Sequence, residues 1–160
     1  MNYIDLIIGA LIVELIMMST FLSGIFKSKY LFKWYEKFGL GAVLADITSI
    51  MVIIIIAYFI YPFLFTKFSI ILFICVAVSI QMIHDLLFGY FISYSHSQSP
   101  ILNIFKLYAE DHGFKIILVD ALLVISTILV MFFLKKFSMN IKYFILILSL
   151  YILTFLLYSF

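Results

Sequence analysis

Four carboxylate residues lie inside segments that are otherwise apolar enough to cross a membrane: Glu14, Asp46, Asp85 and Asp120. They make up half of the eight acidic residues in the chain. A charged side chain at the centre of a bilayer costs roughly 2.5–3.5 kcal/mol on insertion scales. We therefore expect each of these carboxylates to be functional, or at least paired across helices.

Other polar residues accompany two of these acids on the same helix face. Gln81, His84 and Asp85 have the spacing i, i+3 and i+4, so one side of a helix presents an amide, an imidazole and a carboxylate. Ser49 follows Asp46 by three residues and shares its face. The candidate polar cluster therefore includes an amide, a hydroxyl and an imidazole as well as carboxylates.

The depths of the acids allow them to meet. At 1.5 Å per residue, Asp46, Asp85 and Asp120 lie roughly 8–12 Å from the lysine-rich ends of their segments. Glu14 lies nearer the middle of its segment. Three of the acids can therefore meet in one half of the bilayer, but the rotation of each helix is not defined where a segment is apolar on every side.

Three interpretations of this cluster remain open. Polar contacts between membrane helices contribute well under 2 kcal/mol each on average, yet they define which helix faces which. Alternatively, the carboxylates and His84, whose usual titration range is near neutral pH, form a proton or cation relay. A divalent ion held by His84 and the aspartates is the third interpretation, but positions on separate helices predict no geometry, so we assign no metal ligand.

The composition excludes an ordinary soluble protein, because 67% of the residues are hydrophobic and only 11% are charged. We predict an all-α polytopic transmembrane bundle in one domain, 1–160, with four to five spanning helices. A window of about 20 residues crosses the apolar core of a bilayer. The segments of this kind lie near 5–26, 40–63, 69–93, 115–134 and 141–159. The last is the least secure, because lysines bracket the very short turn before it.

Known templates for membrane enzymes and cofactor proteins do not fit. The Gly39-Leu40-Gly41-Ala42 segment lacks the aspartate of the Gly-x-Gly-Asp element used by intramembrane aspartyl proteases. The Glu-x-x-His pairs of di-iron bundles are absent from the sequence. His84 is in a span, whereas His96 and His112 are in a connection, so a bis-histidine haem is not supported. We predict no catalytic residue and no cofactor.

Two connections have the pattern of short helices in the headgroup plane, near 29–38 and 100–112. In the first, aromatic and aliphatic residues recur at i, i+3, i+4 and i+7 with lysines between them. An ordinary loop in the aromatic belt is the alternative. The residues expected to contact headgroups or partner proteins are Lys29, Lys33, Trp34, Tyr35, Lys37, Phe105, Lys106 and Tyr108.

The two connections also indicate an internal duplication. Residues 32–35 match residues 105–108, and residues 44–46 match residues 118–120. Each half then consists of an acidic span, an interfacial helix and a second acidic span. Two such units would be related by a pseudo-twofold axis along the membrane normal. Chance similarity in a strongly biased composition is the alternative.

Several segments together resemble a group of small polytopic membrane proteins encoded by large DNA viruses of algae and protists. They are Gly-Ala-Val-Leu-Ala-Asp-Ile-x-Ser-Ile at 41–50, Ile-Gln-Met-Ile-His-Asp-Leu-Leu-Phe at 80–88, Ile-Phe-Lys-Leu-Tyr-Ala-Glu at 104–110 and Ile-Leu-Val-Asp-Ala at 117–121. The resemblance implies a protein of the infected cell's membranes or of the lipid layer beneath an icosahedral capsid. It transfers no catalytic residue.

The sequence thus predicts an integral membrane protein, in a virion inner membrane or a host cell membrane, with a non-enzymatic structural or assembly role. Its expected partners are the lipid bilayer, further copies of itself, and other membrane or capsid proteins. Nucleic acid is not expected, because the ten basic residues are all lysines without a clustered basic face. The alternative is a small proton- or cation-conducting protein that uses Asp46, His84, Asp85 and Asp120, and a membrane enzyme is the third class.

Overall fold

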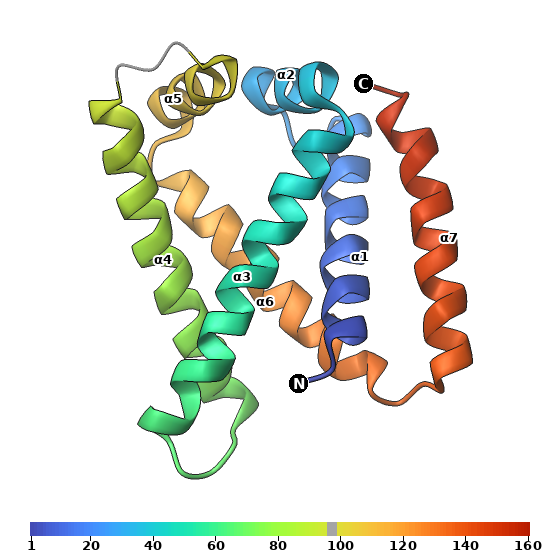
Figure 1. The fold of residues 1–160 in the computed structure, drawn as a ribbon. Coiled ribbons are helices and arrows are strands. Elements are labelled where there is room, and N and C mark those ends of the chain that lie inside the picture. The colour runs from blue at the N-terminus through green and yellow to red at the C-terminus, as the bar shows by residue number, and fades with distance from the viewer. Residues whose placement is uncertain (96–98) are drawn as a thin grey trace.

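The computed structural model describes residues 1–95 and 99–160, and this part of the chain forms seven helices and no strand (Figure 1). His96 lies outside the described residues. The helices are α1 (Tyr3–Leu22), α2 (Lys29–Phe38), α3 (Leu40–Leu64), α4 (Ile70–Tyr94), α5 (Pro100–His112), α6 (Lys115–Leu134) and α7 (Met139–Leu157). Five of them, α1, α3, α4, α6 and α7, are long and apolar enough to cross a membrane. The predicted all-α membrane bundle is confirmed.

The first spanning helix is displaced from the range that hydropathy predicts. It begins at Tyr3, where the Asn2 side chain accepts a hydrogen bond from the backbone N–H of Ile4 at 3.0 Å. It ends at Leu22, because the chain then turns through Gly24, whose φ of +73° is readily adopted only by glycine. Apolar residues therefore continue beyond the helix, which is why hydropathy alone extends it to residue 26.

The short helices α2 and α5 lie side by side across the ends of the spanning helices (Figure 1). Each ends at a glycine with positive φ, Gly39 at +48° and Gly113 at +51°. The N–H of Gly39 donates to the carbonyl of Tyr35 at 2.8 Å, and that of Gly113 donates to the carbonyl of Ala109 at 2.9 Å. The same glycine turn therefore redirects the chain from each interfacial helix into the next spanning helix.

The helix order repeats as the sequence predicts, with α1-α2-α3 followed by α4-α5-α6 and with α7 outside the repeat. The halves pack against each other through the pairs α1 and α6, α2 and α5, and α3 and α4. Asp46 and Asp120 each follow their glycine, Gly39 or Gly113, by seven residues. The repeat therefore carries acids at matching positions into the same end of the bundle.

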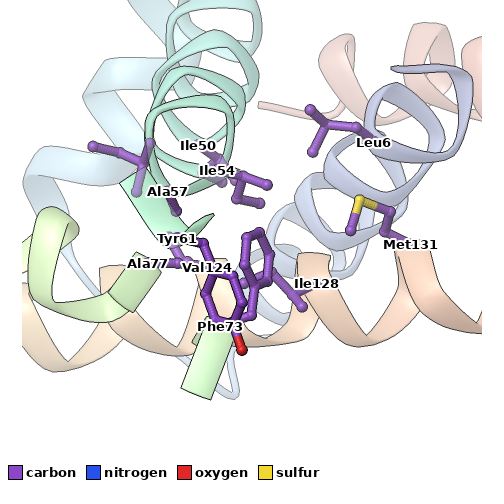
Figure 2. Close-up of a cluster of buried hydrophobic side chains, with 11 residues drawn as sticks. Leu6, Ile50, Ile54, Ala57, Tyr61, Phe73, Ala77, Val124, Ile128 and Met131 are labelled. Atoms are coloured by element: carbon purple, nitrogen blue, oxygen red, sulfur yellow. The ribbon is translucent and has the colours of Figure 1, made fainter. Parts of the chain in front are cut away.

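Away from α2 and α5, the helices α1, α3, α4 and α6 meet in a continuous apolar cluster (Figure 2). Tyr61 belongs to it and also organises the α3–α4 connection, because its hydroxyl accepts from the N–H of Ser69 at 2.8 Å and donates to the carbonyl of Lys67 at 3.0 Å. The buried members are Leu6, Ile50, Ile53, Ile54, Ala57, Tyr61, Phe73, Ala77, Val124, Ile128 and Met131. The side chains of this cluster are therefore packed mainly through apolar contacts.

Two further contacts position α1. A Cβ atom at Gly9 would lie 3.1 Å from the carbonyl oxygen of Thr127, so α1 and α6 approach through their backbones. At the same end of the bundle, the ammonium of Lys142 on α7 lies 2.6 Å from the Asp5 carboxylate, and both side chains are buried. This ion pair joins α7 to the repeat.

Candidate functional site

Beneath α2 and α5 lies a cavity of about 740 Å³, bounded by α3, α4 and α6. Glu14, Asp46, Asp85 and Asp120 all line it. The other polar residues of the predicted cluster, Ser49, Gln81 and His84, line it as well. Carboxylates from four spanning helices therefore share one intramembrane space, which we call the carboxylate cavity.

In the first half of the repeat, the acids are joined by a hydrogen-bonded cluster. The Tyr35 hydroxyl donates to Glu14 Oε1 at 2.8 Å and also lies 3.2 Å from Asp46 Oδ2. The indole N–H of Trp34 donates to the same Asp46 oxygen at 3.0 Å. One phenolic hydrogen thus serves two carboxyl groups, so Glu14, Tyr35 and Asp46 act as one unit.

The local sequence of α2 explains this arrangement. The hydroxyl of Ser28 caps the helix by accepting the N–H of Leu31, at 3.4 Å. Trp34 and Tyr35 then face the bundle, whereas the lysines of α2 remain exposed. Burial raises the pKa of Tyr35 well above its usual value of 10.0, and the charges of Glu14 and Asp46 raise it further. The phenol therefore keeps its proton and acts as a donor.

In the second half, Asp85 is only partly satisfied. Its Oδ1 accepts the Gln81 amide N–H at 2.6 Å and lies 3.2 Å from Nδ1 of His84. Its Oδ2 is buried and has no hydrogen-bond partner among the described residues, although the side chain is 11% exposed. An unpaired carboxylate oxygen inside a bundle is costly, so Asp85 Oδ2 has unused capacity to accept a donor.

Tyr108 and Asp120 also belong to the second half, and no hydrogen bond joins their side chains. Tyr108 holds the position in α5 that Tyr35 holds in α2, and it is only 7% exposed. Neither its hydroxyl nor the Asp120 carboxylate forms a side-chain hydrogen bond with any described residue. Burial and the charges of Asp120 and Asp46 raise the pKa of Tyr108, so it also stays protonated. The acids of the first half thus accept hydrogen bonds from their own half, whereas Asp120 and Asp85 Oδ2 have no donor among the described residues.

The structure corrects the expected role of three contact residues. Trp34, Tyr35 and Tyr108 are buried within the monomer and line the cavity, so they do not form an outer contact surface. The i, i+3, i+4 spacing of α2 identifies the face that carries Trp34 and Tyr35, but the sequence gives no indication that this face donates hydrogen bonds to acids. Phe105 is half-buried, with its ring centroid 4.8 Å from that of Trp34. The four predicted lysines, Lys29, Lys33, Lys37 and Lys106, are exposed.

The donor set of the cavity does not form a metal centre. Within the described ranges, no three His, Cys, Asp or Glu side chains lie close enough together to hold a metal ion. The acids instead approach one another from separate helices across an open space, bordered by Phe88, Phe105 and Ile92. Such a site can accept protons or an organic cation with an apolar body.

None of the protein-family models, curated proteins or solved structures compared with this chain matches it. The observations that bear on function are therefore those of the carboxylate cavity itself: its four acids, its two protonated tyrosines and the unpaired oxygen of Asp85.

Proposed function

We propose that this integral membrane protein binds a cation in the carboxylate cavity and exchanges it for protons. The proposal rests on one observation, the convergence of Glu14, Asp46, Asp85 and Asp120 on a single cavity. Four like charges inside a membrane repel one another, so their charge has to be balanced by bound protons or by a cation. A cation that enters the cavity then displaces protons from it.

The unpaired polar atoms favour a binding site over packing contacts. Acids that only hold helices together would be expected to pair with donors on neighbouring helices. Glu14 and Asp46 do so, but Asp85 Oδ2 and Asp120 face about 740 Å³ of space without a donor from the described chain. The structural role at a viral membrane remains a prediction from the sequence. The hydrogen bonds of the carboxylate cavity do not bear on it.

The cavity belongs to one half of the bundle. On the side away from α2 and α5, the apolar side chains of the cluster around Ile54, Phe73 and Ile128 pack between α1, α3, α4 and α6. In addition, the two halves of the repeat run in the same direction and hold their acids at the same end. We therefore propose a carrier or receptor that binds from one side, in place of a permanently open pore.

Proton release tests the proposal. Protein in lipid nanodiscs, weakly buffered near neutral pH with a pH dye, receives methylammonium chloride in place of choline chloride at constant ionic strength. Wild-type protein is expected to release protons, and an Asp85→Asn/Asp120→Asn variant is expected to release far fewer. Asp111→Asn, which changes an exposed aspartate on α5, is the matched control and should behave as wild type. The absence of proton release from folded wild-type protein would contradict the proposal.

A further inference from the structure

We infer that the cation is the primary ammonium group of a membrane-soluble amphiphile, which enters the carboxylate cavity sideways from the bilayer. This inference rests on the proposed function and names the chemical class of its ligand. It depends on three features: aromatic contacts that join the two interfacial helices, exposed residues of the cavity lining on the side of the bundle, and carboxylate oxygens that have no donor from the described chain.

Aromatic rings close the roof toward the interface. The ring centroid of Phe105 on α5 lies 4.8 Å from that of Trp34 on α2 and 5.5 Å from that of Phe88 on α4. Trp34 is buried and is also held by its hydrogen bond to Asp46. The rings join the two interfacial helices to α4, so they narrow any passage between α2 and α5.

The side of the cavity reaches the surface that faces lipid. Leu86 and Phe114 both line the cavity, yet they are 61% and 65% exposed. Leu86 lies eight residues before the end of α4 at Tyr94, which is roughly 12 Å deep at 1.5 Å per residue. At that depth an exposed leucine contacts acyl chains and not water. The side of the cavity near Leu86 on α4 therefore reaches the surface that the bilayer would cover.

The free acceptors select the head group. Asp85 Oδ2 and the Asp120 carboxylate have no donors from the described chain, and both line the cavity. A primary ammonium has three N–H donors and a positive charge, so it can donate to more than one carboxylate. A quaternary ammonium supplies the charge but no donor. Apolar lining residues, including Ile92, Ile117 and Leu123, accommodate the chain that follows the head group.

Binding of dodecylammonium to the protein in nanodiscs tests the inference. Trp34 is the one tryptophan of the sequence and lines the cavity, so its emission reports occupancy. We expect dodecylammonium to bind at least roughly tenfold more tightly than dodecyltrimethylammonium. The trimethyl analogue has no N–H group and therefore loses the hydrogen bonds to the charged carboxylates. Methylammonium, which lacks the chain, should also bind at least about tenfold more weakly, because its few apolar atoms leave the cavity walls unfilled.

Two controls separate binding in the cavity from simple partitioning into lipid. The Asp85→Asn/Asp120→Asn variant should lose the preference for dodecylammonium over its trimethyl analogue, whereas Asp111→Asn should keep it. If the variant does not fold, the comparison of the three ligands on wild-type protein still decides the matter. Equal binding of dodecylammonium and dodecyltrimethylammonium, or binding unchanged in the folded variant, would overturn the inference.

The outcomes also distinguish this inference from the proposed function. If methylammonium releases protons and binds as tightly as dodecylammonium, the ligand is not an amphiphile, but the proposed exchange of a cation for protons is retained. If no cation of the series binds and no protons are released, both the proposed function and the inference about its ligand are wrong.

Discussion

Tyr35 and Tyr108 occupy matching positions in the two halves of the repeat but differ in what their hydroxyls contact. Tyr35 donates to Glu14 and lies within hydrogen-bond distance of Asp46. Tyr108 lines the same cavity without a hydrogen-bond partner among the described residues. Tyrosines at matching positions thus differ: one completes a hydrogen-bonded cluster, and the other has a hydroxyl without a described partner.

The first prediction compares these tyrosines directly. Tyr35→Phe removes the shared donor of two buried carboxyl groups, so we expect it to lower the free energy of unfolding by about 1–3 kcal/mol. Tyr108→Phe removes a hydroxyl that pairs with no described side chain, so its effect should stay within about 0.5 kcal/mol. Unfolding of both variants in the same detergent measures the difference, and equal losses would show that the Tyr35 cluster is not stabilising.

The raised pKa of Tyr35 gives a second prediction, for alkaline pH. In the unfolded chain a tyrosine loses its proton near its usual pKa of 10.0, whereas the buried Tyr35 keeps it. The folded state thus binds one more proton, so the contribution of this residue to stability is complete below that pH and is lost as pH rises above it. Tyr35→Phe should show a shallower alkaline decrease in unfolding temperature than wild type. Parallel curves for the two proteins would rule this out.

At the scale of the helix, α7 is attached to the bundle by an ion pair and not only by apolar contacts. Lys142 is buried and lies 2.6 Å from Asp5 in the first turn of α1. The sequence presents Lys142 as one of several lysines near a short turn, so its burial is not apparent from charge patterning. Only the packing of α7 against α1 brings the two residues together.

The third prediction tests this attachment. Lys142→Met leaves the Asp5 carboxylate buried without a cation and is expected to cost about 3–5 kcal/mol of unfolding free energy. The double variant Asp5→Leu/Lys142→Met removes both charges and should recover most of that loss. A double-mutant cycle in detergent gives the coupling between the two residues, and additive single effects would contradict the ion pair.

The fourth prediction concerns the crossing of α1 and α6. Gly9→Ala would bring a Cβ atom within 3.1 Å of the Thr127 carbonyl oxygen, so the helices must separate at an expected cost of about 1–3 kcal/mol. Gly41→Ala is the matched control, since a Cβ atom there meets nothing within 4 Å. The control should be neutral or stabilising by up to about 1 kcal/mol, because alanine favours a helix over glycine. A Gly9→Ala protein as stable as Gly41→Ala would refute the close crossing.

For the whole molecule, hydropathy and the spacing of apolar residues were sufficient to predict the order of the helices, although the first span was displaced. The ranges 29–38 and 100–112 agree with α2 and α5, because Ser28, Pro100 and the two terminal glycines define the ends chemically. Spans such as α3 are apolar on every side, so their rotation is absent from the sequence pattern. The convergence of the four acids on one cavity could therefore not be predicted, although their similar depth could.

The proposed activity also belongs to the scale of the whole molecule. Neither half of the repeat encloses the carboxylate cavity alone, since its acids come from α1 and α3 in one half and from α4 and α6 in the other. A packed apolar cluster lies on one side of it, and the contacting rings of Trp34 and Phe105 lie on the other. The molecule thus gathers acids from both halves in the part of the bundle beneath α2 and α5, as the proposed cation site requires.

Infrared difference spectroscopy tests the central claim, that these acids exchange protons for a bound cation. Protein in nanodiscs is compared before and after addition of methylammonium and then of dodecylammonium. The account predicts that the carbonyl band of protonated carboxyl groups decreases when the cation binds and that carboxylate bands grow in its place. Asp85→Asn/Asp120→Asn should weaken this change, and Asp111→Asn should not. A cation that binds while the carboxyl bands stay unchanged would contradict the account.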